Sequence, residues 1–156
     1  MVIFISGHRD ITIDEFYKHY ELPICSALGE YGDDVSFVVG DYEGCDEQAQ
    51  KCLYRHIKAM GLKCPVTVYH MYDKPRNNVH KFPTIGGFTS DHDRDMAMTL
   101  VSDRDIAFVR YGRLGSGTSQ NVLRRHVKDV FAHLSAHTQG IILDNWNDTW
   151  NKKSLV

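Results

Sequence analysis

The sequence predicts a single-domain α/β protein in which a mostly parallel sheet of about five strands lies between two layers of helices. The chain has 156 residues, which is enough for one domain and too few for two of ordinary size. Short continuous apolar runs, typical of strands buried on both faces, alternate with longer segments of helical periodicity. This alternation predicts right-handed βαβ units, in which a helix crosses between two parallel strands.

The first strand is predicted at residues 2–5, an apolar run that ends in a polar turn. A helix is expected to begin at Ile13, with Thr12 as its N-cap, because apolar side chains then recur at helical spacing. Pro23 lies within this stretch and is expected to kink or break the helix, since proline lacks the N–H that a helix interior needs.

The middle of the chain continues the alternation. Strands are predicted at residues 35–39 and 66–69, with a helix at residues 43–60 between them. Residues 73–89 contain two prolines and a glycine pair and have no clear periodicity. We expect a long loop there, which in a compact domain is either functional or simply disordered.

The last part of the chain predicts a short helix at residues 91–100, a fourth strand at 105–110, and a helix from Thr118 to about residue 134. Residues 141–143 are a candidate fifth strand. We therefore expect a domain at residues 1–144 and a polar tail at 145–156. With the usual strand order 3-2-1-4-5, these elements form a Rossmann-like three-layer sandwich, whose ligands bind beyond the carboxyl ends of the strands.

Composition narrows the function classes. Eighteen Lys and Arg against twenty Asp and Glu give a formal charge of −2, which argues against a nucleic-acid partner. No apolar run approaches the length of a membrane span, and the first residues lack the pattern of a signal peptide. The four cysteines form no CxxC pair. We expect a cytoplasmic protein with free thiols and no membrane partner.

A glycine-rich turn follows the predicted fourth strand and leads into a helix. Gly115, Ser116, Gly117 and Thr118 allow close backbone approach and supply hydroxyl and amide donors at the positive end of a helix dipole. This pattern favours a phosphate cradle, although a tight connection without a ligand is the alternative. The turn matches neither a P-loop nor the dinucleotide fingerprint.

The turn after the first strand contains Gly7, His8 and Arg9. Arg9 offers a planar, permanently charged fork for a phosphate or a carboxylate. The alternative is a surface ion pair between Arg9 and either Asp10 or Asp14.

The turn after the second strand is acidic and runs from Gly40 to Asp46. A carboxylate there, from Glu43 or Asp46, can accept ribose hydroxyls or stabilise positive charge developing on a sugar. Alternatively, these carboxylates only cap the helix that follows. In the usual strand order the three turns converge, which favours a nucleotide with its phosphate over the glycine-rich turn and Arg9 and its sugar near the acidic turn.

Three stretches also carry a family resemblance. Residues 6–10 read Ser-Gly-His-Arg-Asp, residues 40–46 read Gly-Asp-Tyr-Glu-Gly-Cys-Asp, and residues 94–98 read Arg-Asp-Met-Ala-Met, followed by Ser-Gly-Thr at 116–118. These stretches resemble three motifs of the SLOG superfamily, in the same order and over roughly residues 2–130. The first resembles the Gly-x-Arg-Asp turn, and the second resembles the Gly-x-x-x-Gly-Ala-Asp-x-x-Ala pattern. The third resembles the Arg-Asn-x-x-Met segment with its Gly-Gly-Thr loop. This superfamily unites the LOG phosphoribohydrolases with DprA-like and YspA/YpsA-type proteins.

The resemblance implies a Rossmannoid nucleotide-binding protein with Arg94 near the ligand phosphate, distantly similar to nucleoside deoxyribosyltransferases, which cleave N-glycosidic bonds with a carboxylate. The sequence departs from the LOG pattern at Asn121, where those enzymes carry a glutamate. A catalytic carboxylate must then come from elsewhere, and Asp46 and Glu43 are the candidates. The candidate phosphate- and nucleotide-binding residues are Gly7, His8, Arg9, Gly40, Arg94, Gly115, Ser116, Gly117, Thr118 and Asn121.

Two functions follow from these observations. The first is an enzyme that hydrolyses or transfers at the N-glycosidic bond of a nucleotide or nucleoside. The second is a binding module of the SLOG type without chemistry, which Asn121 favours. We expect no cofactor and no metal, because the nine histidines form no HExxH motif or paired cysteine–histidine spacing. A small-molecule nucleotide or nucleoside is the expected partner, together with a possible homodimer.

Overall fold

The structure is a computed structural model of the chain, and it describes residues 1–134 and residue 139. The chain divides into two compact units, residues 1–125 and residues 126–156. All five strands and all predicted site residues belong to the first unit. In the second unit, the Gln139 side chain donates hydrogen bonds of 3.0 Å to the carbonyl oxygens of Phe131 and Leu134.

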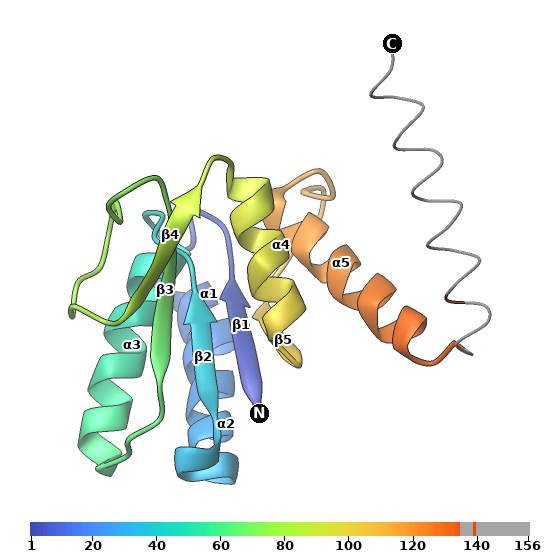
Figure 1. The fold of residues 1–156 in the computed structure, drawn as a ribbon. Helices are drawn as coiled ribbons and strands as arrows, with labels where there is room; N and C mark the ends of the chain where they lie inside the picture. The colour runs from blue at the N-terminus through green and yellow to red at the C-terminus, as the bar shows by residue number, and fades with distance from the viewer. Residues whose placement is uncertain (135–138, 140–156) are drawn as a thin grey trace. The chain divides into compact units, whose positions relative to one another are not determined.

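The first unit is built on one sheet of five parallel strands, which confirms the predicted single-domain Rossmann-like α/β fold (Figure 1). The strand order is β4-β3-β2-β1-β5, so the expected order of the first four predicted strands is kept, but the sheet has an additional strand, β4, beside β3. The strands β2, β3 and β4 thus follow one another on one side of β1, and β5 pairs with the other side of β1. The strands are β1 (Val2–Ser6), β2 (Ser36–Val39), β3 (Val66–Met71), β4 (Thr84–Phe88) and β5 (Arg104–Ala107).

Helices connect these strands and cover both faces of the sheet. They are α1 (Ile13–Phe16), a π-helical turn (Tyr17–Glu21), α2 (Leu22–Tyr31), α3 (Cys45–Met60), α4 (Asp91–Val101) and α5 (Gly117–Ala132). Alternate residues of each strand point to opposite faces. Ile3 and Ile5 of β1 therefore join the larger core under α1, α2 and α3, whereas Phe4 joins a smaller cluster with Met98 of α4.

The expectation of a loop throughout residues 73–89 is wrong, because β4 lies within it. The strand pairs in parallel with β3 at the edge of the sheet and is largely exposed, so it lacks the apolar run of a buried strand. Its Gly86 packs against the ring of His70, where an added Cβ would collide with the imidazole. Glycine in a strand weakens the strand pattern, although here it permits the close approach.

Pro23 does not break its helix, although a break was one of the two expected outcomes. The backbone N–H of Leu22 donates to the carbonyl of Tyr17, five residues earlier, which widens the helix by one residue in the turn before the proline. Pro23 then occupies the first turn of α2, where its missing N–H costs little. The helix continues through Tyr31. The π-helical turn, called the wide turn below, ends at Glu21.

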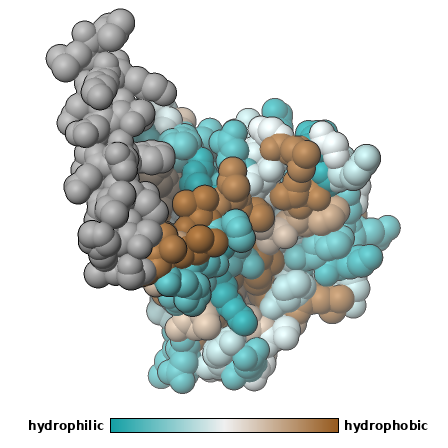
Figure 2. Space-filling view, turned by 90° about the vertical axis from the view of Figure 1, so that its right-hand side faces the viewer, coloured by the Kyte–Doolittle hydropathy of each residue, from teal (hydrophilic) through white to brown (hydrophobic). Residues whose placement is uncertain are grey.

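The remaining elements agree with the sequence within a few residues, except that β5 ends at Ala107 rather than at residue 110. The candidate strand at 141–143 and the tail at 145–156 lie outside the described residues. None of the described helices has the length and apolar character to cross a membrane. Figure 2 shows hydrophobic side chains among polar ones on one face of the surface. The homodimer stays a prediction. Exposed apolar residues of α4 and the start of α5 are Met96, Leu100, Val101, Val122 and Leu123.

Candidate functional site

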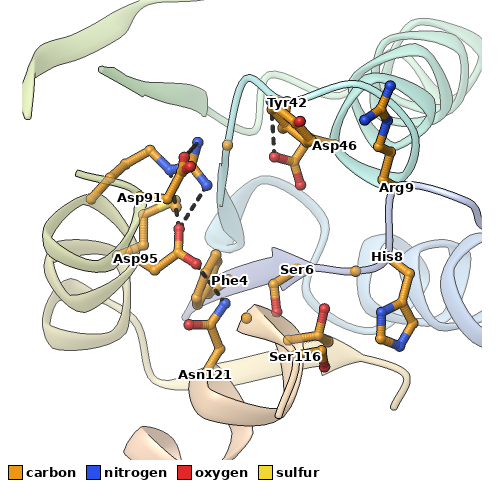
Figure 3. Close-up of a pocket in the computed structure, with 16 residues that line it drawn as sticks. Phe4, Ser6, His8, Arg9, Tyr42, Asp46, Asp91, Asp95, Ser116 and Asn121 are labelled. Atoms are coloured by element: carbon orange, nitrogen blue, oxygen red, sulfur yellow. Dashed lines mark hydrogen bonds and ion pairs between the residues drawn. The ribbon is translucent and has the colours of Figure 1, made fainter. Parts of the chain in front are cut away.

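A cavity of about 260 Å³ lies at the carboxyl edge of the sheet, where β1 is flanked by β2 and β5. The topological switch point of an open parallel sheet is the usual place for a ligand. Figure 3 shows the side chains converging there from several elements. The cavity is lined by Phe4, Ser6, Gly7, His8, Arg9, Gly40, Tyr42, Asp46, Asp91, Arg94, Asp95, Met98, Ser116, Gly117, Thr118 and Asn121.

The cavity brings together all of the predicted site residues except Glu43 and Gly115. Glu43 instead forms an ion pair with Arg9, and its side chain is 49% exposed. Sequence reasoning missed six lining residues: Phe4, Ser6, Tyr42, Asp91, Asp95 and Met98. In the sequence, Phe4 and Met98 have the pattern of ordinary core residues, and Asp91 has that of an acidic residue in the first turn of a helix. The alternation of β1, which places Phe4 and Ser6 on one face, was the available signal.

Asp46 lies in the first turn of α3 and is 8% exposed. Its Oδ2 accepts a hydrogen bond of 3.1 Å from the backbone N–H of Tyr42 (Figure 3). Burial raises the pKa of Asp46 from 3.8 to about 7, against the opposing charge of Arg94 and with a further contribution from Asp95. A carboxyl group with this pKa exchanges its proton readily near neutral pH, as a general acid or base must.

Two glycines permit close packing around the first turn of α3, where Asp46 lies. A Cβ on Gly40 would overlap the Asp46 carboxylate, and a Cβ on Gly7 would overlap the Cys45 side chain and the hydroxyl of Tyr20. Glycine at these two positions therefore permits close packing of the backbone against neighbouring side chains.

The wall beside Asp46 is a network of paired charges centred on Arg94, which is 5% exposed. Its guanidinium bonds to Asp41 and Asp91 at 2.9 Å and to Asp95 at 2.8 Å. Arg76 adds an ion pair of 2.6 Å to Asp41. Burial acts to raise the pKa of Asp41, but its hydrogen bonds and charge interactions with the two arginines hold that pKa below 3.8. Arg94 thus holds this wall of the cavity together through its ion pairs. A ligand phosphate would compete with three carboxylates for the guanidinium of Arg94.

Asn121, which is 1% exposed, belongs to the same wall. Its amide donates a hydrogen bond of 2.9 Å to Asp95, and its carbonyl oxygen accepts one from Arg124. Both polar ends of the amide are therefore engaged. This residue positions Asp95 and has no means of acting as a carboxylate itself.

The opposite side of the cavity carries hydrogen-bond donors. Ser116 caps α5, since its Oγ accepts from the N–H of Ser119 at 3.2 Å. The N–H groups of Gly117 and Thr118 lie in the first helical turn, where no earlier carbonyl of the helix reaches them. The hydroxyl of Ser6 is buried and has no hydrogen-bond partner within the described part of the chain. These groups form a surface suited to an anion.

His8 completes the donor side in its neutral form. Its Nε2 accepts a hydrogen bond of 3.3 Å from the backbone N–H of Arg110, which places the proton on Nδ1. Burial lowers the pKa of His8 below 6.5, and the nearby charges of Arg110 and Arg113 lower it further. The imidazole is therefore an uncharged donor at neutral pH.

Comparisons with known proteins add no relative: no family model, no curated protein and no solved structure matches the chain at a significant level. The likeness to the SLOG superfamily rests on its short motifs alone.

Proposed function

We propose that this chain binds a nucleotide or nucleoside phosphate in the cavity and hydrolyses or transfers at its N-glycosidic bond. One observation carries the proposal. Asp46, a buried carboxyl group with a pKa of about 7, lines the same cavity of about 260 Å³ as the N-terminal turn of α5. The cavity therefore combines a proton-exchanging group with an anion-binding surface. Cleavage of a phosphorylated nucleoside requires both.

The phosphate lies at the start of α5 in this proposal. Backbone N–H groups at a helix N-terminus bind phosphate without the cost of moving side chains. The hydroxyl of Ser6 gains the partner that it lacks in the structure. Gly117 and Thr118 supply the amides, and Arg9, which is paired with Glu43 at the rim, contributes an exposed positive charge.

The sugar lies near Asp46. In its protonated form, the carboxyl group donates a proton to the leaving nitrogen of the base as the C1′–N bond breaks. The resulting carboxylate stabilises the positively charged sugar and then takes a proton from the water or acceptor hydroxyl that forms the new bond to C1′. The base leaves with one proton, and Asp46 is returned to its starting state.

A second function, a nucleotide-binding module without chemistry, is supported by Asn121. The amide stands where the LOG enzymes carry a glutamate, and both of its polar ends are engaged by Asp95 and Arg124. In this alternative the same cavity holds the ligand intact.

A thermal-shift screen over nucleosides, nucleoside monophosphates and dinucleotides, with chromatography of each hit, tests both functions. A ligand at about 100 times its dissociation constant stabilises a fold by about 2.7 kcal/mol, which is readily seen. A shift with release of free base supports the enzyme, and a shift with an intact ligand supports the binding module. If no compound in the set shifts the transition, nucleotide binding is contradicted.

A further inference from the structure

A second cluster of reactive side chains lies away from the cavity, between the end of the π-helical turn and the middle of α3. One ligand atom from each of Glu21, Cys52 and His56 falls within 4.8 Å of the other two. Two of them are already in contact, since His56 Nε2 lies 2.8 Å from Glu21 Oε1. None of the three lines the cavity at the sheet edge, so the cluster is a separate feature.

The backbone explains why the three side chains meet. Cys52 and His56 are four residues apart on α3, so they lie on the same side of that helix one turn apart. Glu21 faces them from the neighbouring helix, at the last residue of the wide turn. One extra residue in a helix rotates the side chains that follow it, and such π-turns are frequent at functional sites.

A thiolate, an imidazole and a carboxylate are the three side-chain ligands that zinc takes in proteins. Neighbouring ligand atoms in a tetrahedral zinc site are about 3.3–3.8 Å apart, so closure requires side-chain shifts of about an ångström. Cys52 is 2% exposed, whereas the side chains of Glu21 and His56 are 22% and 24% exposed. The cluster is therefore anchored in the core and reached from solvent.

From this geometry we infer a zinc-binding site formed by Glu21, Cys52 and His56, which is independent of the proposed nucleotide function. Binding replaces the contact between His56 and Glu21 with two bonds to the cation and removes the thiol proton of Cys52. The fourth position is left to water. Such a site joins the wide turn to α3, the helix whose first turn carries Asp46.

Arg55 is the one cation that contacts the cluster in the described part of the chain. Its Nη2 lies 2.6 Å from Glu21 Oε1 and 3.4 Å from His56 Nε2. The side chain is 62% exposed, so it can turn into solvent without leaving a buried charge. Arg55 therefore competes with the metal for Glu21, and its removal provides a variant that strengthens binding.

Cobalt titration of the full chain, reduced, untagged and stripped with a chelator, tests the site. Co²⁺ bound by a thiolate gives a near-ultraviolet charge-transfer band, and four-coordination gives intense visible bands. We expect both, with one equivalent bound and then displaced by Zn²⁺. Absence of the charge-transfer band overturns the proposal.

Variants assign the ligands. Cys52→Ser is expected to abolish the charge-transfer band, while the matched control Cys64→Ser, also a buried thiol, retains it. His56→Gln, at a partly exposed position, is expected to weaken Co²⁺ binding more than about tenfold, and circular dichroism checks that each variant is folded. A band that survives Cys52→Ser but is lost in Cys25→Ser overturns the assignment.

Arg55→Gln separates a metal site from a purely structural cluster. If the three side chains bind a cation, loss of the competing arginine tightens Co²⁺ binding. Unchanged or weaker binding in this variant contradicts the site as we describe it.

Discussion

Two sets of buried charged groups lie at the same edge of the sheet and differ in how they are satisfied. Around Arg94, each charge has partners of opposite sign at 2.8–2.9 Å. Asp46 is almost as deeply buried, and it accepts a hydrogen bond from a backbone N–H but forms no direct ion pair within the described part of the chain. Burial raises its pKa to about 7, even though the nearby charge of Arg94 acts to lower it. Buried charges in direct ion pairs stay charged and hold the wall of the cavity in place, whereas a buried carboxyl group without a direct ion pair has a raised pKa and exchanges its proton near neutral pH.

The comparison also separates the two carboxylates that the acidic turn offers. Glu43 is half exposed and pairs with Arg9, so its surroundings resemble those of an ordinary surface group. Asp46 is buried and its pKa is raised, although only three positions separate the two residues in the sequence. Perturbed pKa values of this kind gather at active sites.

The largest effect is expected from Asp46→Asn. The amide oxygen can still accept from Tyr42, so the fold is kept, but the proton transfer is lost. We expect kcat for base release to fall by about 10²–10⁴-fold, with ligand affinity changed little. Steady-state kinetics and a binding isotherm measure the two quantities. Glu47→Gln, the neighbouring residue of the same helical turn, is the matched control, and full activity in Asp46→Asn would assign the chemistry elsewhere.

Arg94→Met is expected to cost about 3–5 kcal/mol of stability, because it removes the ion-pair partner of the buried Asp95 and leaves Asp41 with Arg76 alone. Urea denaturation of both proteins measures the difference. Arg9→Met, which breaks an exposed pair with Glu43, is expected to cost no more than about 1 kcal/mol. Equal losses in the two variants would contradict the distinction between the braced wall and the surface.

The pH dependence of stability is expected to carry the signature of Asp46. Because its pKa is about 7 in the folded chain and 3.8 ordinarily, the folded state binds the extra proton between these values, and stability falls as pH rises through that window. Asp46→Asn lacks this loss, so its stability relative to the parent should rise by on the order of 4 kcal/mol from pH 4 to pH 8. Denaturant titrations at several pH values give the difference curve, and a flat curve refutes the raised pKa.

Glycine substitutions probe the close approach behind Asp46. Gly40→Ala places a Cβ against the Asp46 carboxylate and is expected to cost about 1–3 kcal/mol. Gly29→Ala, in the open face of α2, meets no neighbouring atom and should stabilise the chain by about 0.5–1 kcal/mol. Thermal unfolding measures whether each substitution raises or lowers the stability. If Gly40→Ala leaves the stability unchanged, the turn can accommodate a Cβ next to Asp46.

The smallest effect on stability is expected from Ser6→Ala. The hydroxyl is buried and lacks a partner within the described residues, so its removal should leave the free energy of unfolding unchanged or raise it by up to about 1 kcal/mol. In the proposed complex this hydroxyl donates to the phosphate, so ligand affinity should fall in the same variant. Calorimetric titration with the best ligand of the nucleotide screen measures this loss. A destabilised variant that binds normally would place Ser6 in the fold rather than in the site.

The sequence predicted much of the fold because the periodicity of burial is a local property. A strand buried on both faces is an apolar run, and a helix with one buried side repeats every three or four residues. These patterns located β1, β2, β3, α3, α4 and α5 to within a few residues. They failed at β4, since an exposed edge strand containing two glycines has no such pattern.

The site was predicted in outline for the same reason. Parallel strands end at one edge, so polar turns after neighbouring strands must converge, and the cavity contains most of the residues chosen on that ground. The choice between Asp46 and Glu43 was not available from the sequence. Both are carboxylates in one short turn, and only the packing around them differs.

The sequence by itself predicted every described strand except β4, the turns that meet at the carboxyl edge of the sheet, and the chemical types of residue gathered there. Only the tertiary structure decided the raised pKa of Asp46, the partners of Arg94, and the meeting of Glu21 with Cys52 and His56. The physical reason is distance along the chain: the bond between Asp41 and Arg94 spans 53 positions. Burial and charge pairing depend on neighbours in space, which local sequence patterns do not record.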